Sequence, residues 1–153
     1  MVELATLALE RNAHTSGARV SLVLEQVLSS GVLLWPAADL SKIDLYDHNR
    51  ITEDGAEAVA LVLVHRHREW RVVRRIQHGE HADWLLEDCQ GGVHERVALE
   101  VSGVDRGATN SRLTEKLIQV AKMMNVHQRW ACVVGFEEPT AVLRPAEEQL
   151  HGY

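Results

Sequence analysis

Two acidic residues lie in strand-like segments where an apolar side chain would be usual. Asp83 opens the strand-like run from Ala82 to Asp88, and Glu100 interrupts the otherwise apolar run from Val97 to Val101. A carboxylate buried without a partner is costly in free energy. Mg²⁺ and Mn²⁺ favour hard oxygen ligands, and bound Mg²⁺ can position water and offset charge on a phosphoryl transition state. Asp83 and Glu100 are therefore the two carboxylates that need either a neutralising partner or a function.

The elements that must position these carboxylates form one pattern between residues 52 and 136. Thr52 is expected to cap a helix, because Glu53 and Asp54 fall in the first turn, where the helix dipole favours negative charge. A strand over Val59 to Val64 is the rival interpretation, but the cap, alanine content and length favour a helix. The expected elements are a helix over 53–65, strands over 70–77, 82–88 and 96–102, a helix over 111–124, a strand over 130–136 and a last short strand over 141–144.

This order of elements resembles the αβββαβ core of the PD-(D/E)xK superfamily, the restriction-endonuclease-like fold. In that family an acidic residue begins the second strand, and a Glu or Asp stands two residues before a lysine on the third. Asp83 and Glu100 match these two positions. The family often adds a glutamate from the first helix, for which Glu57 is the candidate and Glu53 its competitor. The resemblance implies that Glu57, Asp83 and Glu100 bind Mg²⁺ or Mn²⁺.

The sequence departs from the family at Ser102, where the lysine should stand. Without that cation, activation of the attacking water and stabilisation of the phosphoryl transition state lose their usual source. Lys116 is the expected replacement, because its side chain is long and its helix should pack over the same sheet. Gln119, near the same helix face, is expected to contact metal-bound water or a phosphate. The candidate catalytic residues are therefore Asp83, Glu100, Lys116 and Gln119.

Simpler explanations exist for each carboxylate. Asp83 fits a turn residue at a strand end, and Glu57 fits a surface position on a helix. Glu100 would be satisfied by a structural ion pair with Arg74 or Arg96 across the sheet.

Other candidate sites carry weaker patterns. The segment from His78 to His81, together with His94, offers Zn²⁺ ligands, but it has neither a cysteine pair nor the His-Glu-x-x-His spacing. The two cysteines, Cys89 and Cys132, each lie in or beside a strand-like run and are expected to be buried thiols.

The N-terminal part is expected to precede the nuclease-like core as a β-hairpin. Residues 4–10 and 18–25 are strand-like and flank the turn-forming residues 12–17, and 31–50 reads as a connector with a short strand over 32–35. The fold class expected is α/β (α+β), a mixed central sheet with an αβββαβ core behind this hairpin. Residues 1–153 suit a single domain, with the hairpin and connector over 3–50 and the core over 52–144.

Composition limits the functions that fit this chain. Its 153 residues are 46% hydrophobic and 25% charged, with a net charge of −6, which disfavours broad non-specific nucleic-acid binding. Five arginines between His65 and His81 still offer a local basic patch. The longest apolar run, Ala58 to Val64, is far below the roughly 20 residues that span a bilayer. Residues 1–11 lack the pattern of a secretory signal, so a cytoplasmic protein without a membrane partner is expected.

Two functional hypotheses follow. The first is a Mg²⁺- or Mn²⁺-dependent nuclease that hydrolyses phosphodiester bonds of DNA or RNA with a protein partner or as a homodimer, pairing through strand edges of residues 3–25. The alternative is a catalytically inactive nuclease-fold domain that acts as a binding or assembly subunit. The missing lysine and the acidic net charge favour the alternative. An unrelated small α/β binding domain remains if the order of elements is wrong.

Overall fold

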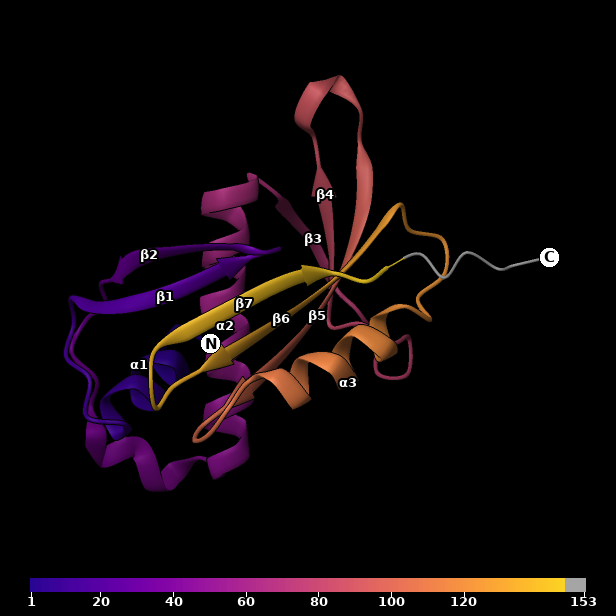
Figure 1. Cartoon of the computed structure of the whole chain (residues 1–153). Helices are drawn as coiled ribbons and strands as arrows, with labels where there is room; N and C mark the ends of the chain where they lie inside the picture. The colour runs from indigo at the N-terminus through magenta and orange to yellow at the C-terminus, as the bar shows by residue number, and fades with distance from the viewer. Residues whose placement is uncertain (148–153) are drawn as a thin grey trace.

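The computed structural model describes residues 1–147 as a seven-stranded mixed sheet with helices on both faces, which confirms the expected α/β class (Figure 1). The strand order is β2-β1-β7-β6-β5-β4-β3. Among the described residues, no helix combines the length and apolar character needed to span a bilayer. The elements are α1 (Val2–Arg11), β1 (Ala18–Leu24), β2 (Val27–Leu33), η1 (Leu40–Leu45), α2 (His48–Arg68), β3 (Arg71–Arg75), β4 (Trp84–Asp88), η2 (Gln90–Gly92), β5 (Glu95–Val104), α3 (Asn110–Val120), β6 (Gln128–Gly135) and β7 (Thr140–Pro145).

From α2 to β6 the chain follows the order that the sequence predicts: helix, three strands, helix, strand. β3, β4 and β5 pair antiparallel in succession. α3 then carries the chain across the sheet to β6, which pairs parallel with β5. A crossover of this kind is what two parallel neighbouring strands require. β7 returns antiparallel to β6, as the last expected strand.

The expected strand over residues 4–10 is wrong, because this segment belongs to helix α1. Leu4, Leu7 and Ala8 are buried at helical spacing. Leucine and alanine favour helices, and Glu3 and Arg11 stand at the ends where the helix dipole stabilises them. A short apolar run of this kind fits a buried strand and a buried helix equally well by periodicity. Packing against α2 decides for the helix.

The N-terminal hairpin is therefore formed by β1 and β2 rather than by residues 3–25. The predicted strand over 18–25 is β1, and the short strand expected over 32–35 is the end of the longer β2. β1 also pairs parallel with β7, so it lies between two strands and offers no free edge. The edge strand on this side of the sheet is β2, which lies outside residues 3–25. Residues 3–25 therefore offer no free strand edge for the expected pairing of two copies.

Helix α2 begins one turn earlier than predicted. Its N-cap is Asp47, whose side chain accepts hydrogen bonds from the backbone N–H groups of Asn49 at 2.9 Å and Arg50 at 3.3 Å. Thr52 lies inside the helix and donates its hydroxyl to the His48 carbonyl at 3.2 Å. Both Asp and Thr are good N-caps, so residue type alone did not distinguish Asp47 from Thr52.

Two apolar clusters fill the two faces of the sheet. α1 and α2 cover one face, where Leu7 and Val64 pack with strand residues such as Leu99. α3 covers the other face, where Leu113 and Val120 pack with Ala98. Neighbouring residues of β5 therefore point to opposite layers. Glu100 lies two residues after Ala98, so its side chain points to the same face of the sheet. The Glu100 carboxylate therefore lies in the apolar layer beneath α3.

Strand β5 extends beyond its partner β4, and this mismatch creates the site. The last pair between them joins Trp84 to Leu99, while β5 continues to Val104 against β6 alone. The backbone N–H groups of Val101 and Gly103 consequently have no strand partner on the β4 side. Backbone donors buried in this way must find other acceptors.

Candidate functional site

Two carboxylates accept the hydrogen bonds that β4 does not provide. Asp83, just before β4, accepts from the Val101 N–H at 2.7 Å. Glu53, in the second turn of α2, accepts from the Gly103 N–H at 2.9 Å. The Ser102 hydroxyl lies 3.2 Å from both oxygens of Glu53. Ser102, at the position of the family's lysine, is thus 1% exposed and held by Glu53.

The buried Glu100 pairs with the half-buried Lys116 of α3. The Lys116 Nζ lies 2.5 Å from Glu100 Oε1, and it also donates to Gln119 Oε1 at 3.4 Å. The Glu100 residue is 1% exposed, and its second oxygen, Oε2, is buried without a hydrogen-bond partner. Lys116 therefore satisfies one oxygen of the carboxylate and leaves the other available for a further ligand. The expected structural pairing of Glu100 with Arg74 or Arg96 does not occur among the described ion pairs.

Asp83 lies close enough to Glu100 to influence its ionisation. Burial, and then the negative charge of Asp83, raise the pKa of Glu100 to about 7 against the opposing effect of Lys116. When protonated, Glu100 can also donate a hydrogen bond to Asp83, which raises its pKa further. Two carboxylates that share a site favour either a proton or a cation between them.

Glu57 faces different partners from those expected. Its Oε1 accepts from Arg75 at 2.8 Å, and its Oε2 accepts from the Trp84 indole N–H at 3.2 Å. Burial raises the pKa of Glu57 to about 7, Arg75 opposes this shift, and the charge of Asp83 adds to it. Glu57 is 6% exposed and is therefore not the surface carboxylate of the simpler explanation.

The structure thus places Asp83 beside Glu100, and joins Glu100 to Lys116 and Lys116 to Gln119. Glu57 also lies near Asp83, but its two oxygens are bound by Arg75 and Trp84. Within residues 1–147, Glu57, Asp83 and Glu100 do not bring three ligand oxygens within 4.8 Å of one another. Asp83 and Glu100 are the pair of carboxylates that could hold a divalent cation or share a proton, because the structure shows no hydrogen bond to Oε2 of Glu100 within the described residues. Carboxylate oxygens are the donor type that Mg²⁺ and Mn²⁺ select.

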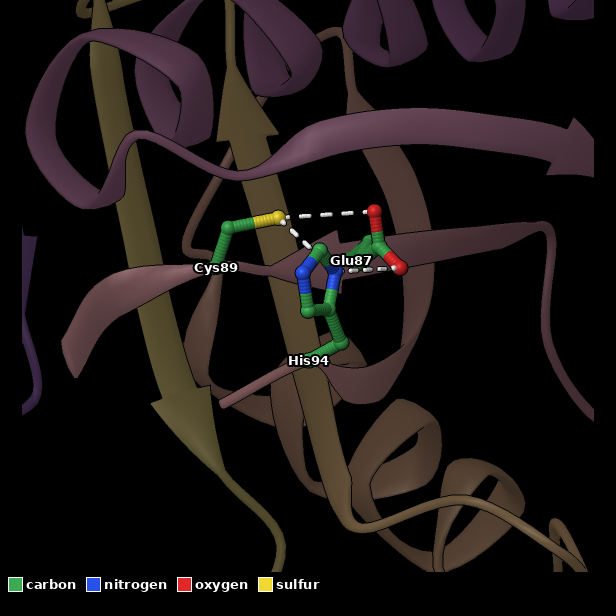
Figure 2. A group of neighbouring side chains, drawn as sticks. All are labelled: Glu87, Cys89 and His94. Carbon is green, nitrogen blue, oxygen red and sulfur yellow. Dashed lines mark hydrogen bonds and ion pairs between the residues drawn. The ribbon is translucent and has the colours of Figure 1, made fainter. Parts of the chain in front are cut away.

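A second group of metal-ligating side chains lies at the end of the β4–β5 hairpin. Glu87, Cys89 and His94 bring one ligand atom each within 4.8 Å of the others, as Figure 2 shows. Cys89 is half-buried, so the expectation of two buried thiols holds for Cys132 alone. His78 and His81, which the sequence grouped with His94, do not join this group. Sequence reasoning missed it because the three residues meet through strand pairing.

Comparison of the chain with protein-family models, with curated proteins and with solved structures found no match. The fold and site alone therefore define its class: a mixed α/β protein in which a buried carboxylate, Glu100, lies beside the half-buried Asp83 and pairs with a lysine from the covering helix.

Proposed function

We propose that this chain is a divalent-metal-dependent nuclease of the PD-(D/E)xK type, acting on the phosphodiester bonds of DNA or RNA. The observation that carries the proposal is the environment of Glu100. This carboxylate is 1% exposed, lies beside Asp83, binds Lys116 through one oxygen and keeps the other without a partner. A carboxylate that served packing alone would be expected to have both oxygens satisfied.

Each residue has a role in this proposal. Asp83 and Glu100 would hold Mg²⁺ or Mn²⁺, which supplies Lewis-acid stabilisation of charge on a phosphoryl group. Lys116 would take the place of the lysine absent at Ser102, since it reaches Glu100 from α3. Gln119 orients Lys116 through its side-chain oxygen. The position of Lys116 supports the expectation that the cation moved from strand to helix.

The order of elements from α2 to β6 supports the same family, because Asp83 precedes the second strand and Glu100 lies on the third. Arg74 and Arg75 lie at the end of edge strand β3 that pairs with Leu85 and Trp84, next to Asp83, and their exposed side chains offer a cationic approach to this end of the sheet. Such clustered arginines attract phosphate even when the whole chain is acidic.

A second candidate function is a nuclease-fold domain that binds or assembles without catalysis. The direct 2.5 Å contact between Lys116 and Glu100 favours it, because a cation already neutralises the carboxylate. The arginine bound to Glu57 and the net charge of −6 favour it as well. The two functions differ in one property, which is affinity for Mg²⁺ or Mn²⁺ at Asp83 and Glu100.

The deciding experiment measures Mn²⁺ and Mg²⁺ binding and nuclease activity on labelled single- and double-stranded DNA and RNA. We expect the wild type to bind Mn²⁺ with a rise in melting temperature and to cleave at least one substrate. Asp83→Asn and Glu100→Gln should lose both effects, because each removes a charged ligand while preserving shape.

Glu138→Gln serves as the matched control, because Glu138 is exposed and its side chain makes no described contact. Mn²⁺ binding without cleavage, lost in the two site variants, would favour the non-catalytic domain. No Mn²⁺ effect in the wild type would contradict the nuclease proposal.

A further inference from the structure

The β4–β5 hairpin carries three metal-ligating side chains that lie close together, outside the proposed nuclease centre. The Cys89 Sγ lies 3.4 Å from Glu87 Oε2 and 3.6 Å from His94 Nδ1. His94 Nδ1 lies 3.1 Å from the other Glu87 oxygen. Figure 2 shows the three side chains turned toward one another from the two arms of the hairpin.

The 3.4 Å and 3.6 Å separations are those expected of neighbouring ligands in tetrahedral coordination, whereas the 3.1 Å separation between His94 and the other Glu87 oxygen is shorter. Around Zn²⁺, bonds of about 2.3 Å to sulfur and about 2.0–2.2 Å to nitrogen and oxygen place neighbouring ligand atoms about 3.4–3.6 Å apart. A cation could therefore bind after small rotations of the side chains. The ligand set of thiolate, imidazole and carboxylate matches Zn²⁺, whereas Mg²⁺ favours oxygen ligands alone.

Strand pairing explains why the three residues meet. The β4–β5 register pairs Glu87 with Arg96 and Asp88 with Glu95, so its continuation sets Cys89 opposite His94. Alternate residues of a strand share a face, so Glu87 and Cys89 point to the same side. Gly91 and Gly92 adopt positive φ angles of 70° and 77° and let the chain reverse between the two arms.

The local charges suit a divalent cation of this kind. Glu87 and a deprotonated Cys89 together neutralise Zn²⁺, and His94 adds a neutral ligand. Arg71 and Asp88 are the further charges acting on Cys89, and they have opposite signs.

We propose that Glu87, Cys89 and His94 form a Zn²⁺ site at the tip of the β4–β5 hairpin. Three protein ligands leave a fourth position for water or an exogenous ligand. Figure 1 shows this hairpin extending beyond the rest of the sheet. His94 is exposed there, and an ion bound to the three side chains would fasten the two arms together. The site is independent of Asp83 and Glu100, so it stands whether or not the nuclease proposal does.

The test is titration of the reduced full-length chain with Zn²⁺ by calorimetry, and with Co²⁺ by absorption spectroscopy. We expect one equivalent of Zn²⁺ to bind, and Co²⁺ to give a thiolate charge-transfer band with the visible bands of tetrahedral coordination. Cys89→Ser should remove the charge-transfer band. Cys89→Ser and His94→Ala should each weaken Zn²⁺ binding by about 10-fold or more.

His78→Ala is the matched control, because His78 is exposed and makes no hydrogen bond or ion pair within residues 1–147. It should bind both metals like the wild type, and Asp83→Asn should do so as well. Circular dichroism verifies that each variant folds. Zn²⁺ binding that is absent from the wild type, or unchanged in both Cys89→Ser and His94→Ala, would overturn the proposal.

Discussion

At the scale of single residues, the stability of the fold depends on how the buried charge of Glu100 is neutralised by Lys116. Replacing one partner of a buried ion pair leaves the other charge unpaired, which typically costs about 3 kcal/mol or more. We expect Lys116→Met to lower the free energy of unfolding by about 3 kcal/mol above pH 7. At lower pH the loss should shrink, because Glu100, whose pKa lies at about 7, takes up a proton. Urea unfolding at pH values on either side of 7 measures both effects.

The double variant Lys116→Met with Glu100→Gln should recover most of that loss, because it removes the unpaired charge. Lys122→Met is the matched control, since Lys122 is exposed in the turn that follows α3. An equal loss at low and high pH, without recovery in the double variant, would show that Lys116 acts through packing rather than charge.

The raised pKa values of Glu57 and Glu100 predict a pH dependence of stability. Both shift from 4.5 to about 7, so between these values the folded chain binds more protons than the unfolded chain. The free energy of unfolding should therefore fall as pH rises through this window, by on the order of 1–3 kcal/mol for each group. Denaturant titrations of wild type and Glu100→Gln test this. The variant should show a shallower fall, and an unchanged slope would contradict the assignment.

At the scale of elements, the approach of α2 to β5 depends on Gly103. A Cβ atom at this position would lie 2.4 Å from the Thr52 carbonyl oxygen, so any side chain forces helix and strand apart. We expect Gly103→Ala to destabilise the fold by about 1–3 kcal/mol and to disturb the Glu53 and Ser102 contacts. Urea unfolding measures the change.

Gly31→Ala is the control for Gly103→Ala, because a Cβ there meets Leu22 at an ordinary 3.5 Å. Its effect should be close to zero or slightly stabilising, since alanine restricts the unfolded chain. Similar losses at both positions would mean that the helix–strand contact tolerates the added methyl group.

At the scale of the whole molecule, one sheet joins the N-terminal segment to the core. β1 pairs with β7, and α1 packs on α2, so neither part keeps its buried face without the other. We expect one cooperative unfolding transition, with coincident curves from far-ultraviolet circular dichroism and tryptophan fluorescence. Trp70, Trp84 and Trp130 are buried reporters in the core. Separate transitions would show that residues 1–33 fold independently.

The sequence by itself determined the order of elements from α2 to β6, because strands and helices there carry clear periodicity and turn residues. It also drew attention to Glu100, because a charged residue inside an apolar run stands out without coordinates, whereas Asp83, Lys116 and Gln119 were predicted from the resemblance to the PD-(D/E)xK superfamily. It did not determine α1, because a short apolar segment lacks the period that separates helix from strand.

The tertiary structure alone decided which charges meet. Whether Lys116, Arg74 or Arg96 neutralises Glu100 depends on which helix covers its face of the sheet, and α3 settles that choice. Glu57 binds Arg75 because β3 lies next to β4. Glu87, Cys89 and His94 meet through the register of a hairpin. Such contacts join residues distant along the chain, and strand register and helix placement are fixed by the packing of the whole core rather than by local sequence.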